Sequence, residues 1–120
     1  MKISTQTKIN ASIQLEQQFS DYQIKYILEQ SIVYSCACPA QVCKAILQER
    51  ELFAYQAKCL NLTTTDAAVH RTIAESVQAV HRVMEHCLVE VLKLEGWDME
   101  TLVMPEALQK RMIDEQCDTD

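Results

Sequence analysis

The longest helical pattern in the chain covers residues 63–96 and reads TTTDAAVHRTIAESVQAVHRVMEHCLVEVLKLEG. Thr63 and Asp66 are typical of a helix start, because a side-chain oxygen caps free amides and an acidic group favours the first turn. Gly96 suits the left-handed residue that ends many helices, and Trp97 is expected to fold back on the last turn. Apolar residues recur at helical spacing and form a continuous apolar stripe, which predicts the buried side of this helix. They are Val69, Ile73, Val77, Val80, Met84, Cys87, Val91 and Leu94.

A first helix is predicted upstream, from about residue 12 to about residue 35. It differs from the later helix because its second half is apolar on two opposite faces, which predicts burial on more than one side. One face carries Leu15, Phe19, Tyr22, Tyr26 and Val33. The other face carries Ile24, Ile27, Leu28, Ile32 and Tyr34.

Two prolines mark the starts of the remaining helices. Proline fits the first helical position, because the amide proton that it lacks would be unbonded there anyway. A second helix is therefore predicted from Pro39 to about residue 60, and a short C-terminal helix from Pro105.

The composition favours helices throughout. A β-rich protein needs many turns, and these 120 residues include one Gly and two Pro. We predict an all-α fold: one domain over residues 1–120, built as an antiparallel bundle of three long helices and the short C-terminal one. Residues 1–11 alternate polar and apolar side chains and are expected to form a flexible or extended arm. The acidic tail 114–120 is expected to fray.

Charge and hydropathy narrow the classes of function. Eleven Lys and Arg against seventeen Asp and Glu give a net charge of −6. This charge argues against a nucleic-acid partner, including a ribbon-helix-helix DNA-binding role for the alternating N-terminus. We find no signal peptide and no apolar run long enough to cross a membrane, so a cytoplasmic location is expected. The six cysteines should then be thiols or metal ligands.

The segment around Cys36, Cys38 and Cys43 is the first candidate for chemistry. Cys38 precedes Pro39 and should lie near a helix N-terminus, where a thiolate is stabilised. A redox role follows if that thiol is reactive. Three sulfurs within eight residues would instead bind zinc or another transition metal if the chain bends. The alternative is that these are small core residues, since free cysteine packs well.

Two further pairs stand out on the predicted helices. His81 and Glu85 are four residues apart on one face, a spacing that fits a metal site completed from another helix or a simple helical pair. Glu29 and Arg50 fall on the inward faces of helices that should be neighbours, so we expect them to form a buried structural ion pair. The sequence contains no glycine-rich phosphate loop and no G-x-S-x-G or H-E-x-x-H motif.

These observations favour a non-enzymatic module that binds a protein partner. The two apolar faces of the first helix indicate self-association, and a homodimer is expected. The rival interpretation is a thiol-based redox or metal-binding protein that uses the cysteine segment.

Overall fold

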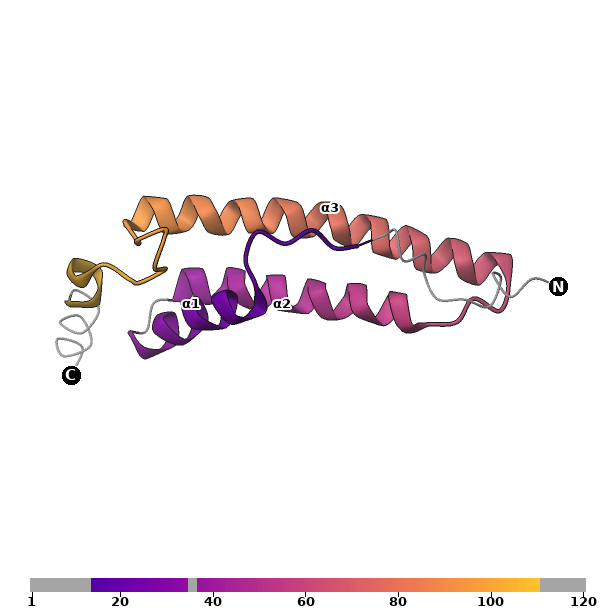
Figure 1. The fold of residues 1–120 in the computed structure, drawn as a ribbon, viewed down its shortest axis with the longest axis horizontal. Coiled ribbons are helices and arrows are strands. Elements are labelled where there is room, and N and C mark those ends of the chain that lie inside the picture. The colour runs from indigo at the N-terminus through magenta and orange to yellow at the C-terminus, as the bar shows by residue number, and fades with distance from the viewer. Residues whose placement is uncertain (1–13, 35–36, 111–120) are drawn as a thin grey trace. The chain divides into compact units, whose positions relative to one another are not determined.

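The computed structural model describes residues 14–34 and 37–110. These residues are mostly helical and include no strand, which confirms the all-α prediction (Figure 1). The predicted arm 1–11, Cys36 and the tail 114–120 lie outside the described residues. The helices are α1 (Asp21–Val33), α2 (Ala37–Lys58) and α3 (Thr64–Glu95), followed by helical residues 106–110.

The described chain divides into two compact units. The minor unit contains residues 14–17 and 48–83, and the major unit contains residues 18–34, 37–47 and 84–110. The prediction of one domain stays a prediction. None of the described helices combines the length and the apolar content needed to cross a bilayer.

The start of α1 differs from the prediction, because residues 14–20 are not helical. Ser20 is the N-cap: its side chain accepts the Gln23 amide at 3.1 Å, and the Gln23 side chain accepts the Ser20 amide at 2.9 Å. This reciprocal capping box satisfies two free donors at once and fixes the helix start there. Residue 12 was therefore the wrong start for this helix.

The ends of α2 and α3 follow local sequence signals closely. α2 begins at Ala37, two residues before the predicted start, and its Pro39 lies in the first turn, where a missing amide proton is tolerated. Thr63 accepts the Asp66 amide at 3.0 Å at the start of α3. At its end Gly96 has φ 84°, and the Trp97 amide donates to the Leu92 carbonyl at 2.9 Å. The predicted glycine cap is confirmed.

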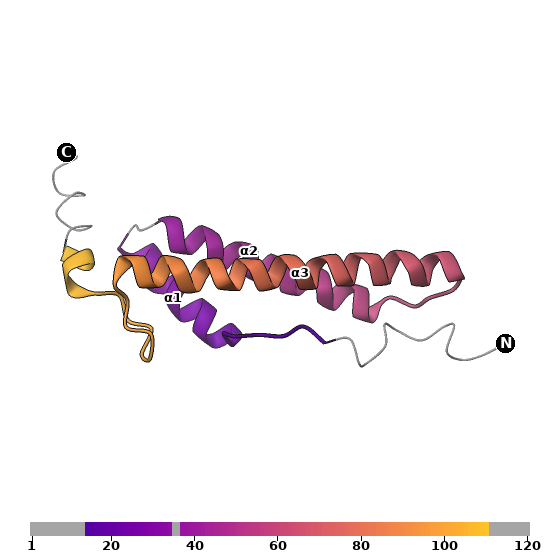
Figure 2. The same ribbon diagram turned by 90° about the horizontal axis from the view of Figure 1, so that it is seen from above.

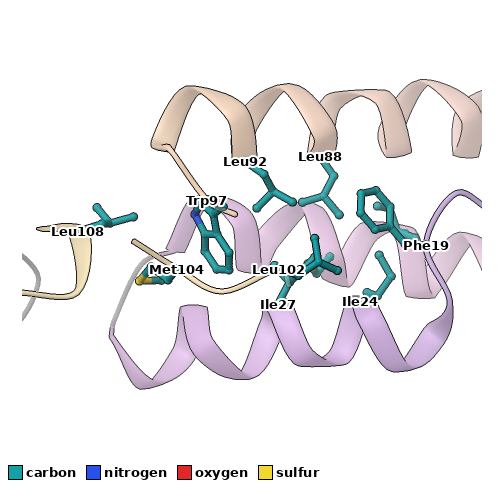
Figure 3. Packing of buried hydrophobic residues seen from close by; sticks show 11 residues of the cluster. Phe19, Ile24, Ile27, Leu88, Leu92, Trp97, Leu102, Met104 and Leu108 are labelled. Atoms are coloured by element: carbon teal, nitrogen blue, oxygen red, sulfur yellow. The ribbon is translucent and has the colours of Figure 1, made fainter. Parts of the chain in front are cut away.

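The major unit holds the larger of two apolar cores. Leu88 and Leu92 on α3 point toward Ile24 and Ile27 on α1, with Trp97 beside them (Figure 3). Trp97 is only 4 % exposed, as expected from its position after the glycine cap. The buried members of this core are Phe19, Ile24, Ile27, Cys43, Ile46, Leu88, Leu92, Trp97, Leu102, Met104 and Leu108.

The minor unit has a much smaller core. Among the described residues of this unit, Phe53, Ala74 and Val77 are the buried members of its core, with Leu15 and Ile73 packed against them. The short connection 59–63 joins the two helices that supply most of these residues (Figure 1). Several large apolar side chains in the described part of this unit are exposed, among them Leu52, Tyr55, Val80 and Val83.

The buried side of α3 is rotated from the predicted apolar stripe. Val69, Val80 and Leu94 were predicted to be buried but are exposed. Two polar residues, His81 and Glu85, are buried with the apolar ones on the observed buried side. Hydropathy spacing treats such residues as solvent-facing, which explains the error. The buried residues of α3 are Ala74, Val77, His81, Glu85, Leu88 and Leu92.

Candidate functional site

The loop after α3 is tightly held by its own backbone. It doubles back before helical residues 106–110 (Figure 2). Asp98 Oδ1 accepts the amides of Glu100 at 2.8 Å and Thr101 at 2.9 Å, and the Asp98 carbonyl accepts the Leu102 amide at 2.7 Å. Leu102 has φ 60°, the left-handed region that a leucine rarely adopts. Its burial in the major-unit core holds it in this costly conformation.

One side chain of α1 fixes the loop to the helix. Gln30 Nε2 donates to the Leu102 carbonyl at 2.7 Å, and Gln30 Oε1 accepts the Met104 amide at 2.8 Å. The amide group thus fills both a donor and an acceptor role in the loop backbone. The loop and the first helix are therefore held in a defined geometry.

A pocket of about 280 Å³ lies between α1 and this loop. Two tyrosines line it from α1: Tyr22 is 81 % exposed and Tyr26 is 38 % exposed. Glu100 contributes a carboxylate from the loop side. The complete lining is Tyr22, Gln23, Tyr26, Glu100, Thr101 and Leu102. We call this the tyrosine pocket.

The electrostatics of the tyrosine pocket are acidic. Backbone N–H groups of Thr101 and then Glu100 stabilise the carboxylate of Asp98 and lower the pKa of that group below its ordinary value. No lysine or arginine occurs between Gly96 and Met104. The loop side of the pocket therefore carries negative charge only.

A polar pair lies in the minor unit. Arg50 of α2 donates its Nε proton to Nε2 of His81 on α3, at 3.0 Å. Arg50 is 8 % exposed and His81 is 1 % exposed. Because Arg50 Nε is only a donor, His81 Nε2 carries no proton in this arrangement. Glu29 lies exposed on α1 in the major unit, whereas Arg50 belongs to the minor unit. The Glu29–Arg50 ion pair therefore stays a prediction.

Glu85 acts as a backbone acceptor in the major unit. Its Oε2 accepts the amides of Gln18 at 2.8 Å and Phe19 at 3.1 Å, and the residue is 2 % exposed. These amides belong to the non-helical segment that precedes α1, so no helical carbonyl accepts their hydrogen bonds. The Glu85 carboxylate accepts them instead. This contact gives Glu85 a structural role.

The carboxyl group of Glu49 is partly buried. Among the described residues, none donates a hydrogen bond to Oε1 of Glu49 on α2, and that atom is buried. Desolvation raises the pKa of this carboxyl above its ordinary value. The group is half-buried, so water reaches part of it.

The described cysteines of the predicted thiol segment differ in environment. Cys38 is exposed in the first turn of α2, whereas Cys43 is buried in the major-unit core. Burial raises the pKa of the Cys43 thiol to about 12, which keeps it protonated at neutral pH. Within residues 14–34 and 37–110, no three His, Cys, Asp or Glu side chains are arranged to hold a metal ion. The metal site of Cys36, Cys38, Cys43, His81 and Glu85 stays a prediction.

A wide uncharged surface covers one side of α3 in the minor unit. We call it the uncharged face, and all of its members except the half-buried Ile73 are exposed. Val83 is the most exposed of its valines, at 64 %. A pocket of about 430 Å³ lies over its N-terminal part. The uncharged face consists of Thr65, Ala68, Val69, Thr72, Ile73, Ser76, Ala79, Val80 and Val83.

Sequence reasoning missed both surfaces. Gly96 and Asp98 are turn-forming residues two positions apart, a signal that could have indicated the ordered loop. Reading α3 for missing charges rather than for apolar residues would have revealed the uncharged face. The spacing of apolar residues could not predict that Tyr22 and Tyr26 lie on the exposed side of α1, because both sides of the predicted first helix are apolar.

Comparison with known proteins gives no match. No family model, no curated protein and no solved structure is similar to this chain at a significant level.

Proposed function

We propose that this protein is a helical interaction module that acts as a homodimer in the cytoplasm. Its helices would form an antiparallel bundle within each chain. The uncharged face would then pack against the same face of a second copy. The single observation that supports this most is the exposure of Val69, Val80 and Val83 on one uncharged side of α3. The free thiols among the described cysteines suit a reducing compartment.

Self-association suits the uncharged face for electrostatic and geometric reasons. Each chain carries a net charge of −6, so two copies repel each other wherever charged surfaces meet. A face without charge avoids this repulsion and matches itself across a two-fold axis. The face extends from Thr65 to Val83, or about 27 Å along the helix at 1.5 Å per residue. That length fits one helix packing along another.

A charge on this face should break the dimer. We expect the wild-type chain at tens of micromolar to show twice the chain mass by size-exclusion chromatography with light scattering. Val83→Glu should shift the sample toward monomer and weaken self-association by roughly 30-fold or more, because it places two carboxylates in an apolar contact.

The matched control is Val33→Glu, on α1 in the major unit. Val33 is 69 % exposed, close to the exposure of Val83, so both variants add the same charge at a similarly accessible valine. This variant should remain dimeric if the uncharged face forms the contact, and should become monomeric if the apolar side of α1 that carries Val33 forms it instead. A monomeric wild-type chain, or equal effects of the two substitutions, would contradict dimerisation through the uncharged face.

A thiol-based redox or metal-binding role is the second candidate. The observation that favours it is the exposure of Cys38 in the first turn of α2, where a reagent or a metal ion can reach the sulfur. Alkylation of the folded protein as a function of pH, together with metal analysis of protein purified without chelator, tests this role. Uniformly ordinary thiol reactivity and the absence of bound metal would remove it.

The buried Cys43 should make stability depend on alkaline pH. Its pKa rises from 9.0 to about 12 in the folded protein, so the unfolded chain loses this proton first. Its stabilising effect is complete below pH 9 and disappears as the pH rises toward 12. We expect a slope of up to about 1.4 kcal/mol per pH unit from this group.

Urea unfolding at several alkaline pH values measures this effect. Tyrosines and lysines also titrate in this range, so the comparison is with Cys43→Ala, whose free energy of unfolding should fall less steeply with pH. Parallel slopes for the two proteins would show that Cys43 ionises as easily in the folded state as in the unfolded state.

A further inference from the structure

The tyrosine pocket combines two features that recognise cations. Tyr22 and Tyr26 offer aromatic rings, whose faces attract ammonium and guanidinium groups. Glu100 adds a carboxylate to the same lining. Arginine suits this combination better than lysine, because its planar group stacks on aromatic rings and pairs with carboxylates through two hydrogen bonds.

The charged residues around the pocket also favour a cationic ligand. The two elements that form the pocket, α1 and the loop after α3, carry Asp21, Glu29, Asp98 and Glu100 between Ser20 and Val33 and between Gly96 and Met104. Lys25 is the one basic residue in these two segments, and it does not line the pocket. An approaching cation is therefore attracted, whereas a carboxylate is repelled.

The size and rigidity of the pocket fit a side chain rather than a larger ligand. At about 280 Å³ the pocket lies just below the roughly 300–1,000 Å³ that is typical of small-molecule sites. Gln30 and the Asp98 turn hold the loop wall in place before any ligand binds. A preformed wall reduces the entropy lost on binding.

We propose that the tyrosine pocket binds an arginine side chain of a partner protein. The guanidinium group stacks on the ring of Tyr22 or Tyr26 and pairs with the carboxylate of Glu100. The pocket belongs to the major unit, and this role does not depend on the dimer contact proposed for the uncharged face of the minor unit. Arginine and tyrosine are also the residues that most often dominate protein–protein contacts.

A short peptide tests the proposal. The probe is the capped tripeptide Gly-Arg-Gly, titrated into isotope-labelled full-length protein and followed by two-dimensional amide NMR spectra. We expect saturable shifts at Tyr22, Tyr26 and the 100–102 amides, with a dissociation constant on the order of 1 mM. The same peptide with citrulline, which has the shape of arginine without its charge, should bind at least about five-fold more weakly.

Two pocket variants and one control complete the experiment. Tyr26→Leu and Glu100→Gln should each weaken peptide binding by roughly three-fold. Tyr55→Leu replaces an exposed tyrosine of α2 in the minor unit and should leave binding unchanged. Equal binding of the arginine and citrulline peptides, or equal affinity in Tyr26→Leu and wild type, would overturn the proposal. Light scattering on the same samples reports the dimer separately, so either proposal can fail alone.

Discussion

Replacing Arg50 by alanine should lower the free energy of unfolding by about 3 kcal/mol. The substitution removes a buried donor to His81 Nε2 and the aliphatic stem that fills space around it. Hydrogen bonds to charged groups contribute about 1.5–3 kcal/mol, and lost packing adds to this. Urea unfolding followed by circular dichroism measures this change in free energy. Thermal unfolding of the same variant should show a fall in melting temperature on the order of 10 °C.

Arg71→Ala is the matched control for this experiment. Arg71 lies on α3 in the same minor unit but is exposed, so its loss should change stability by no more than about 0.5 kcal/mol. If the melting temperature of Arg50→Ala equals that of wild type, the Arg50–His81 contact contributes nothing to stability. Similar losses in both arginine variants would point to net charge as the cause.

Trp97→Ala should have the largest effect on the major unit, about 4 kcal/mol. Trp97 is 4 % exposed, belongs to the main core, and donates its Nε1 proton to Glu95 Oε1 at 2.8 Å. Proteins of this size are often stable by only 5–15 kcal/mol, so such a loss brings the chain close to unfolding. Circular dichroism is the suitable probe, because the variant has no tryptophan left for fluorescence.

The neighbouring Leu94 provides the control. It lies on the last turn of α3 and is 86 % exposed, so Leu94→Ala should change stability by less than about 0.5 kcal/mol. A Trp97→Ala protein that unfolds at the same urea concentration as Leu94→Ala would show that the ring adds little to the core.

Elements fixed by local contacts could be predicted from the sequence, and elements fixed by distant contacts could not. The start and end of α3 were predicted because Thr63 caps an amide three residues away and Gly96 turns the chain directly after the helix. The buried side of α3 was predicted wrongly because His81 receives its hydrogen bond from Arg50, thirty-one residues earlier. Composition and spacing do not reveal such partners.

The same contrast between local and distant contacts applies to the candidate surfaces. The apolar pattern on both sides of α1 predicted burial on more than one side, but the side that carries Tyr22 and Val33 is exposed at these two residues. Which side is exposed depends on a core assembled from α3 and the following loop. The tyrosine pocket also needs that loop, whose Leu102 is seventy-two positions beyond Gln30 in the chain. The reactivity of the cysteine segment could not be ranked from spacing, because burial distinguishes Cys43 from Cys38.

The two hydrogen bonds of Gln30 tie the fluctuations of the post-α3 loop to those of a helix. A loop held only by its own turn opens and closes independently of the rest of a protein, often within microseconds. Here, the Met104 amide and the Leu102 carbonyl become free only when their hydrogen bonds to the Gln30 side chain break. The position of Gln30 is in turn set by the backbone of α1. Loop and helix should therefore behave as one cooperative opening unit, whose exchange with solvent follows the local stability of α1.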